Sequence, residues 1–352
     1  MEANAIPLRG GRSTLERSPL QRLPDQVLYW GLSGLAAGVL ILIGYFFVRL
    51  IGQSSAAFGH IGIVNFFVRS NWDVSQLQQG AACTAGSGHC TFGAAALIIG
   101  TLITSAIALL IGVPVAIATA LYLTELCPRR ARGPLTMLVD LLAAVPSVVY
   151  GLWGFFVLIP HLKGLQQGLG NAFSFLPFVG GTVAGPSYFI AGLILAIMIL
   201  PIVCAIAREV ISTVPSEHKE GALALGATRW EMIRMSVIPY SRAGITGGAM
   251  LGLGRAIGET VAVVLVIGNS PQLGHSVFQQ GYSLAAGIVN EFGEAASTPT
   301  HSSALFAAGL VLFVLTLLVN IIARRFVVRG VGGKRTAGAA VGPQAGADLA
   351  TA

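Results

Sequence analysis

The amino-acid sequence predicts an all-α, polytopic membrane protein with six transmembrane helices. Of its 352 residues, 54% are hydrophobic and 10% are charged, whereas a soluble domain is about 25% charged. Six apolar runs each approach or exceed the roughly 20 residues that a membrane-spanning helix needs. The basic residues collect in alternate segments between those runs, which is the distribution that positively charged cytoplasmic loops produce.

The apolar runs define the order of the predicted regions. The first run, Val27–Leu50, is too long for the core of a signal peptide and is expected to remain uncleaved. The predicted regions are a cytoplasmic arm (1–26), a first transmembrane helix (27–51), an extracytoplasmic loop (52–93), a core of five transmembrane helices (94–325) and a disordered cytoplasmic tail (326–352). The five core helices are predicted at Ala94–Leu123, Leu135–Ile159, Tyr188–Ile211, Ile245–Ile267 and Leu305–Ala323.

The distribution of Lys and Arg predicts which side of the membrane each loop faces. Of the 21 Lys and Arg residues, all but four lie in the arm, in 127–134, in 208–242 or in the tail that begins at Arg324. Both termini and residues 208–242 are therefore predicted to be cytoplasmic, in a cell (inner) membrane. The same bias accounts for the net charge of +7, so we expect lipid, and not nucleic acid, beside these residues.

The cytoplasmic loop from 215 to 239 has the pattern of a helix, a glycine turn and a second helix. Ser216 is a favoured N-cap, and the acidic Glu217 and Glu220 fall in the first turn, where the helix dipole stabilises them. Ala222 continues this helix, and Gly226 stands where the chain needs a residue that tolerates positive φ.

The second helix of this loop is predicted to begin after Thr228. Thr228, Arg229, Trp230 and Glu231 have the spacing of a capping box, and Pro239 is expected to end the helix. An ordinary amphipathic cytoplasmic loop would show the same features, so the pattern alone leaves both interpretations open.

The fifth apolar run, Ile245–Ile267, contains two charges, Arg255 and Glu259, which are followed by Thr260. With a spacing of four, Arg255 and Glu259 are predicted to share one helix face. Either charge would cost about 2.5–3.5 kcal/mol if it faced lipid, so both must face protein or water. One interpretation is a structural ion pair. The other is an anion site, because a guanidinium can bind two oxygens of one oxyanion.

Three segments resemble a known family. The first is the coupling loop of ABC importer permeases, which is matched by Glu220, Ala222, Gly226, Ile238 and Pro239, although Gly221 and Ser236 depart from the family pattern. The sequences "LGLGRAIGETVAVVLVIGN" and "LLAAVPSVVYGLWG" resemble the PstC-type permease subunit of bacterial phosphate ABC importers. The residues after Thr260 favour this subunit over its PstA-type sister.

The resemblance implies a type I ABC importer permease fold without a cofactor in this chain. It implies four partners: a homologous PstA-type permease, a homodimeric PstB-type ATPase that binds ATP and Mg, an extracytoplasmic PstS-type phosphate-binding protein, and inorganic phosphate. The ATPase would contact the coupling loop. Arg255 would line the phosphate path, with Thr260 as a minor polar contact. Glu259 would neutralise Arg255 in the empty path or accept a hydrogen bond from hydrogen phosphate.

Other interpretations remain. A permease for sulfate or molybdate would share these features, and an ATP-independent channel or a membrane enzyme is a more distant alternative. The sequence has no Walker A motif, so this chain is not expected to hydrolyse ATP itself. Neither the cysteines nor the histidines have the spacing of a metal site. Cys83 and Cys90 flank a short extracytoplasmic stretch and form either a disulfide or two free thiols.

The fifth apolar run is also rich in glycine. Gly244, Gly248 and Gly252 repeat every four residues, as do Gly254 and Gly258. Small residues at this spacing allow two helices to pack closely in a membrane. We expect this face to meet the equivalent helix of the second permease subunit.

Overall fold

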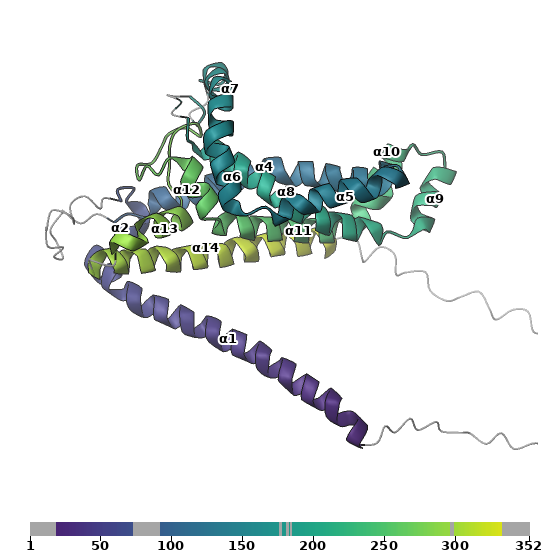
Figure 1. Cartoon of the computed structure of the whole chain (residues 1–352), viewed down its shortest axis with the longest axis horizontal. Coiled ribbons are helices and arrows are strands. Elements are labelled where there is room, and N and C mark those ends of the chain that lie inside the picture. Colours follow the sequence, from purple (N-terminus) through teal and green to yellow (C-terminus); the bar gives the residue numbers. More distant parts are fainter. Residues whose placement is uncertain are drawn as a thin grey trace, which may run out of the picture. The chain divides into compact units, whose positions relative to one another are not determined.

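The computed structural model describes residues 19–72, 92–175, 178–180, 183, 185–295 and 299–332 (Figure 1). These residues form helices, together with two isolated β-bridges that join Trp72 to Phe92 and Gly268 to Gly281. The predicted all-α class is therefore confirmed. Cys83 and Cys90 lie outside the described residues, so their pairing stays a prediction.

Two compact units divide the chain, residues 1–52 and residues 53–352. Helix α1 (Pro19–Ile61) belongs mostly to the first unit. It begins inside the predicted arm and continues past the predicted end at residue 51. Its apolar side chains from Val27 to Ile51 are largely exposed, as a helix surrounded by lipid requires.

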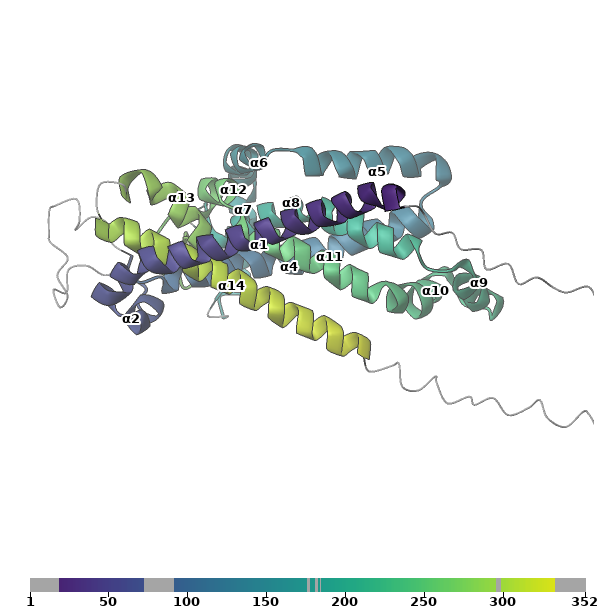
Figure 2. The same ribbon diagram turned by 90° about the horizontal axis from the view of Figure 1, so that it is seen from below.

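Four long helices lie side by side in the second unit (Figures 1 and 2). They are α4 (Ala95–Leu121), α8 (Tyr188–Ser212), α11 (Ile238–Gly258) and α14 (Pro299–Gly332). Helix α8 packs against both α4 and α11 and contributes the most buried residues, among them Ile194 and Ile199. Helix α14 continues past the predicted end of the core at residue 325.

The predicted third span, Leu135–Ile159, is not one helix. The structure contains α5 (Arg129–Ala144), α6 (Ser147–Trp153), the π-helical turn η2 (Gly154–Leu158) and α7 (Ile159–Ala172). Pro146 causes the first break, because a residue before proline avoids the helical region; Val145 is extended, with ψ 127°. Helix α5 lies along α8, whereas α7 leaves the bundle at a steep angle (Figure 1).

The number of candidate spans agrees with the prediction of six. Among the described residues, five helices are long and apolar enough to cross a membrane. A sixth is obtained if Arg229–Gly258 and Val261–Ile267, which are bent by 65° at a short break, form one crossing.

The connecting segments separate to opposite ends of the second unit (Figures 1 and 2). One end carries the loop helices α9 (Ser216–Ala224) and α10 (Arg229–Met232). The other end carries α2 (Ile63–Val68), α12 (Val261–Ile267) and α13 (Leu284–Ala295). Segments that the Lys and Arg distribution assigns to different sides of the membrane therefore lie apart.

Candidate functional site

A break in the fifth apolar run lies beside the two charges that the sequence analysis singled out. Helix α11 ends at Gly258, Glu259 is extended (φ −71°, ψ 130°), and α12 begins at Val261. The predicted continuous helix is therefore wrong here, and Glu259 does not continue the helical face of Arg255. No ion pair joins Arg255 to Glu259 within the described residues. A flexible glycine followed by β-branched Thr260 and Val261 favours such an interruption.

The break between α5 and α6 lies close to the break between α11 and α12. The reason is that α6, which follows the first of these breaks, packs closely on α12, which follows the other. A Cβ atom on Gly151 of α6 would lie 2.6 Å from Leu265 Cδ1 and 3.0 Å from Ala262 Cα. Only glycine permits this approach. The interruption after α5 and the interruption after α11 therefore belong to one region of the molecule.

Tyr150 connects these two interruptions. Its hydroxyl donates a hydrogen bond to the carbonyl oxygen of Leu142, near the end of α5, at 2.7 Å. The same side chain lies within electrostatic range of the Arg255 guanidinium. Arg255 is exposed, in the last turn of α11, and donates no hydrogen bond to any residue that the structure describes.

The two glycine repeats of α11 occupy different faces. Added Cβ atoms at Gly244, Gly248 and Gly252 would contact α8 side chains within this chain. The expectation that this repeat meets a second subunit is therefore wrong. Gly254 and Gly258 have open space beside them, so the second repeat, unlike the first, does not pack on another helix of the described residues.

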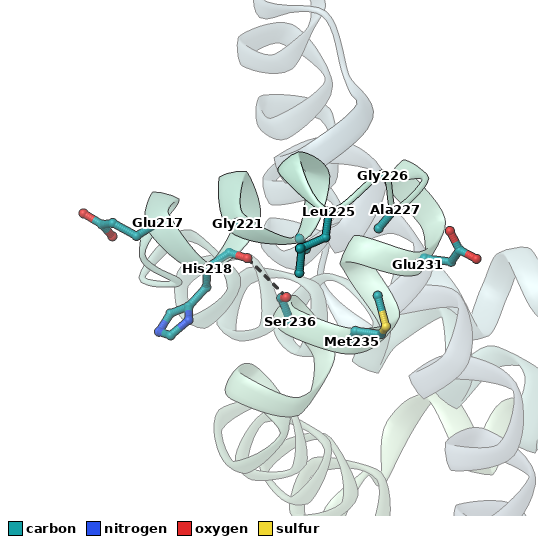
Figure 3. A pocket seen from close by; sticks show the side chains of 10 residues that line it. Glu217, His218, Gly221, Leu225, Gly226, Ala227, Glu231, Met235 and Ser236 are labelled. Atoms are coloured by element: carbon teal, nitrogen blue, oxygen red, sulfur yellow. Dashed lines mark hydrogen bonds between the residues drawn. The ribbon is translucent and has the colours of Figure 1, made fainter.

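The predicted coupling loop forms a groove with a volume of about 610 Å³ (Figure 3). Glu217 and Glu231 lie at opposite sides of this groove, and Leu225 and Met235 lie between them (Figure 3). The complete lining is Glu217, His218, Gly221, Ala222, Leu225, Gly226, Ala227, Glu231, Met235 and Ser236. Of the predicted coupling residues, Glu220, Thr228, Arg229 and Pro239 do not line it.

Local chemistry explains the shape of the loop. Gly226 has φ +85°, as predicted. The capping box is also present: the Glu231 amide donates to Thr228 Oγ1 at 3.3 Å, and the Thr228 amide donates to Glu231 Oε2 at 2.8 Å. The predicted N-cap was wrong by one residue, because Pro215 holds that position and Ser216 is already helical.

Pro239 does not end a helix, contrary to the prediction. Helix α10 continues through the π-helical turn η3 (Ile233–Val237) into α11, and Pro239 lies in the first turn of α11. A proline cannot donate the hydrogen bond of a regular α-helix and its ring crowds the preceding turn, and the wider π-helical turn just before Pro239 accommodates this irregularity. The coupling loop is therefore joined to Arg255 by nearly continuous helix.

Two side-chain contacts of α9 were not anticipated from the sequence. Ser236 Oγ, at a position where the family pattern has an aliphatic residue, donates to the carbonyl oxygen of His218 at 3.3 Å (Figure 3). Lys219 Nζ forms an ion pair with Glu125 Oε1 at 2.7 Å. The partners of this pair are 94 residues apart in the sequence, so no local pattern indicates it.

A buried polar cluster at the opposite end was also missed. Glu291 of α13 accepts hydrogen bonds from Trp72 Nε1 at 2.7 Å and from the Tyr282 hydroxyl at 3.1 Å, and its Oε2 lies 2.9 Å from His301 Nε2. Burial and the Glu291 carboxylate raise the pKa of Tyr282, so its hydroxyl remains protonated and can donate. This cluster joins Trp72, which precedes α4, to residues in and beside α13 and α14.

Comparisons with known proteins agree with this architecture. Residues 112–329 match the family described as the binding-protein-dependent transport system inner membrane component. A chain of the crystal structure of a bacterial alginate ABC transporter, in complex with an alginate-bound periplasmic protein, aligns with a TM-score of 0.57 at 18% identity. It covers 88% of this chain and 99% of that one. This likeness shows the fold alone.

Curated relatives narrow the family. The phosphate transport system permease protein PstC of Mesorhizobium japonicum is 44% identical over 312 residues, which is 87% of this chain and 91% of the relative. The phosphate transport system permease protein PstC of Haemophilus influenzae is 41% identical over 296 residues, which is 83% of this chain and 89% of the relative. The chain therefore belongs to the PstC family of phosphate transport system permease proteins.

Proposed function

We propose that this chain is one of two permease subunits of an ATP-driven importer of inorganic phosphate in the inner membrane. The observation that carries the proposal is the exposed guanidinium of Arg255 beside two adjacent helix breaks, in a chain of the PstC family. The Lys and Arg distribution supports cytoplasmic termini.

The helix breaks favour a path for a polar solute. Interrupted backbone inside a membrane needs protein partners or a water-lined cavity, and transporters commonly place substrates at such breaks. Arg255 stays charged at any working pH and can bind two phosphate oxygens. We assign Thr260, which lies in the break, as a further polar contact.

Glu259 is assigned to anion selection, because its carboxylate can accept a hydrogen bond from the P–OH of hydrogen phosphate, a donor that sulfate lacks. Glu259→Gln is expected to narrow the preference for phosphate over sulfate, because a neutral amide repels sulfate less. Competition uptake with labelled phosphate and unlabelled sulfate measures this. Unchanged competition would remove Glu259 from the selectivity assignment.

The open face of α11 is assigned to the homologous second permease, of the PstA type. Gly254→Leu should block copurification with that subunit while the chain keeps its own melting temperature, because the added side chain enters open space. Gly248→Leu is the matched comparison. Its Cβ would meet Ile206 at 3.1 Å, so it should destabilise the chain itself by about 1–3 kcal/mol. Normal copurification of Gly254→Leu would contradict this assignment.

The groove of the coupling loop is assigned to a homodimeric PstB-type ATPase, which would bind ATP and Mg. Leu225 and Met235, which line the groove, are 91% and 60% exposed. Exposed apolar side chains gathered on one surface favour a protein partner. Because α10, η3 and α11 follow one another without a loop, movement of the ATPase would displace the helix that carries Arg255.

Reconstitution tests the proposed function. The chain would be placed in vesicles with the second permease, the ATPase and the extracytoplasmic PstS-type binding protein, and uptake of phosphate, sulfate and molybdate would be compared. ATP-dependent uptake of phosphate alone is expected, and the chain by itself should be inactive. Preferred uptake of another oxyanion would favour the second candidate, and conduction without the ATPase would indicate a channel.

A further inference from the structure

The ion pair between Lys219 and Glu125 joins the coupling loop to a helix that the proposed mechanism does not otherwise use. Lys219 belongs to α9, and Glu125 belongs to η1 (Tyr122–Leu126), the π-helical turn that continues α4. Their side chains are 22% and 10% exposed, and their charged atoms are 2.7 Å apart. A short, largely shielded pair is screened by salt less than a surface pair.

None of the residues of α9 is fully buried; Ala222 packs on the neighbouring apolar core, and polar contacts add further connections. The hydrogen bond from Ser236 to the His218 carbonyl ties it to η3 and so to α11. The Lys219–Glu125 pair ties it to α4. A displacement of α9 can therefore reach two different long helices through two different side-chain contacts.

Helix α4 leads from this pair to the opposite end of the second unit (Figures 1 and 2). Near its other end, Thr101 Oγ1 accepts a hydrogen bond from the Leu284 amide at 2.9 Å, at the start of α13. A Cβ on Gly100 would lie 1.9 Å from the Tyr282 carbonyl oxygen, which shows how closely α4 contacts this outer segment.

We propose that Lys219 and Glu125 are positioning residues that transmit motion of the coupling loop to α4 and, through α4, to the outer segment around Tyr282 and Leu284. This inference rests on the proposed function, because it assumes that an ATPase moves α9. It adds a second route beside the one through α11. The pair touches neither substrate nor nucleotide in this assignment.

The test measures phosphate uptake and ATP hydrolysis in the same vesicles of the assembled transporter. Lys219→Met and Glu125→Gln should each assemble normally but move at least about fivefold less phosphate per ATP hydrolysed, the lower end of typical coupling between sites. The charge-exchanged double variant, Lys219→Glu with Glu125→Lys, should recover most of this ratio. The matched control is Glu209→Gln, which changes an exposed carboxylate near the end of α8 that leads to α9. It should leave the ratio of phosphate moved to ATP hydrolysed unchanged.

A structural role alone would alter assembly or melting temperature without altering the ratio. An unchanged ratio in the single variants, or an assembled double variant that recovers nothing, overturns the proposal. Failure of all three variants to assemble also overturns it, because the pair would then be a folding contact. If the unaltered transporter shows no ATP-dependent phosphate uptake, the proposed function itself is wrong and the inference falls with it.

Discussion

Replacing Arg255 with alanine is expected to lower phosphate uptake by the assembled transporter by about 10- to 100-fold. A hydrogen bond to a charged group contributes about 1.5–3 kcal/mol, and each 1.36 kcal/mol changes a rate by a factor of ten. The chain should still fold, because Arg255 is exposed and donates no hydrogen bond to the residues that the structure describes. Initial rates of labelled phosphate uptake measure the effect.

Two further variants separate charge from geometry. Arg255→Lys keeps the positive charge but loses the planar fork that binds two oxygens at once, so it should retain part of the uptake. Arg324→Ala removes an exposed arginine from α14 and should leave uptake unchanged. If Arg255→Ala assembles and transports at the normal rate, the anion assignment is wrong and the side chain has another role.

The second large effect is expected at Glu291, through stability. Glu291→Leu should destabilise the chain by about 3–5 kcal/mol, because each buried hydrogen-bond donor that loses its acceptor costs about 1–3 kcal/mol. It leaves Trp72 Nε1 and the Tyr282 hydroxyl, both in buried residues, without their acceptor. His301, which is 1% exposed and stacks on Phe92, also loses its partner. Thermal unfolding of the purified chain in detergent measures the loss.

A variant that removes one carboxylate elsewhere controls for charge. Glu209→Gln changes an exposed carboxylate of α8, and its melting temperature should stay close to that of the unaltered chain. The melting temperature of Glu291→Gln should lie between those of the control variant and Glu291→Leu. Its amide oxygen still accepts hydrogen bonds, whereas its NH2 group would face other donors. A normal melting temperature for Glu291→Leu would show that the cluster does not stabilise this end of the second unit.

Local signals were sufficient for much of the coupling loop. The capping box at Thr228 and Glu231 and the positive φ of Gly226 depend on neighbouring residues only, and both are present. Pro239 shows the limit of such signals. A proline can either end one helix or begin another. Here Pro239 lies in the first turn of α11, directly after the π-helical turn η3, and its own sequence neighbourhood does not distinguish the two cases.

The sequence by itself determined the helical class, the number of candidate spans, the loop pattern and the family, because hydrophobicity, charge bias and short motifs are properties of contiguous residues. Only the tertiary structure decided the partners across the chain. It placed Gly248 against α8, left Gly254 open, and joined Lys219 to Glu125 and Trp72 to Glu291. The physical reason is that these contacts depend on how separate helices pack, and no local period or spacing in one sequence carries that information.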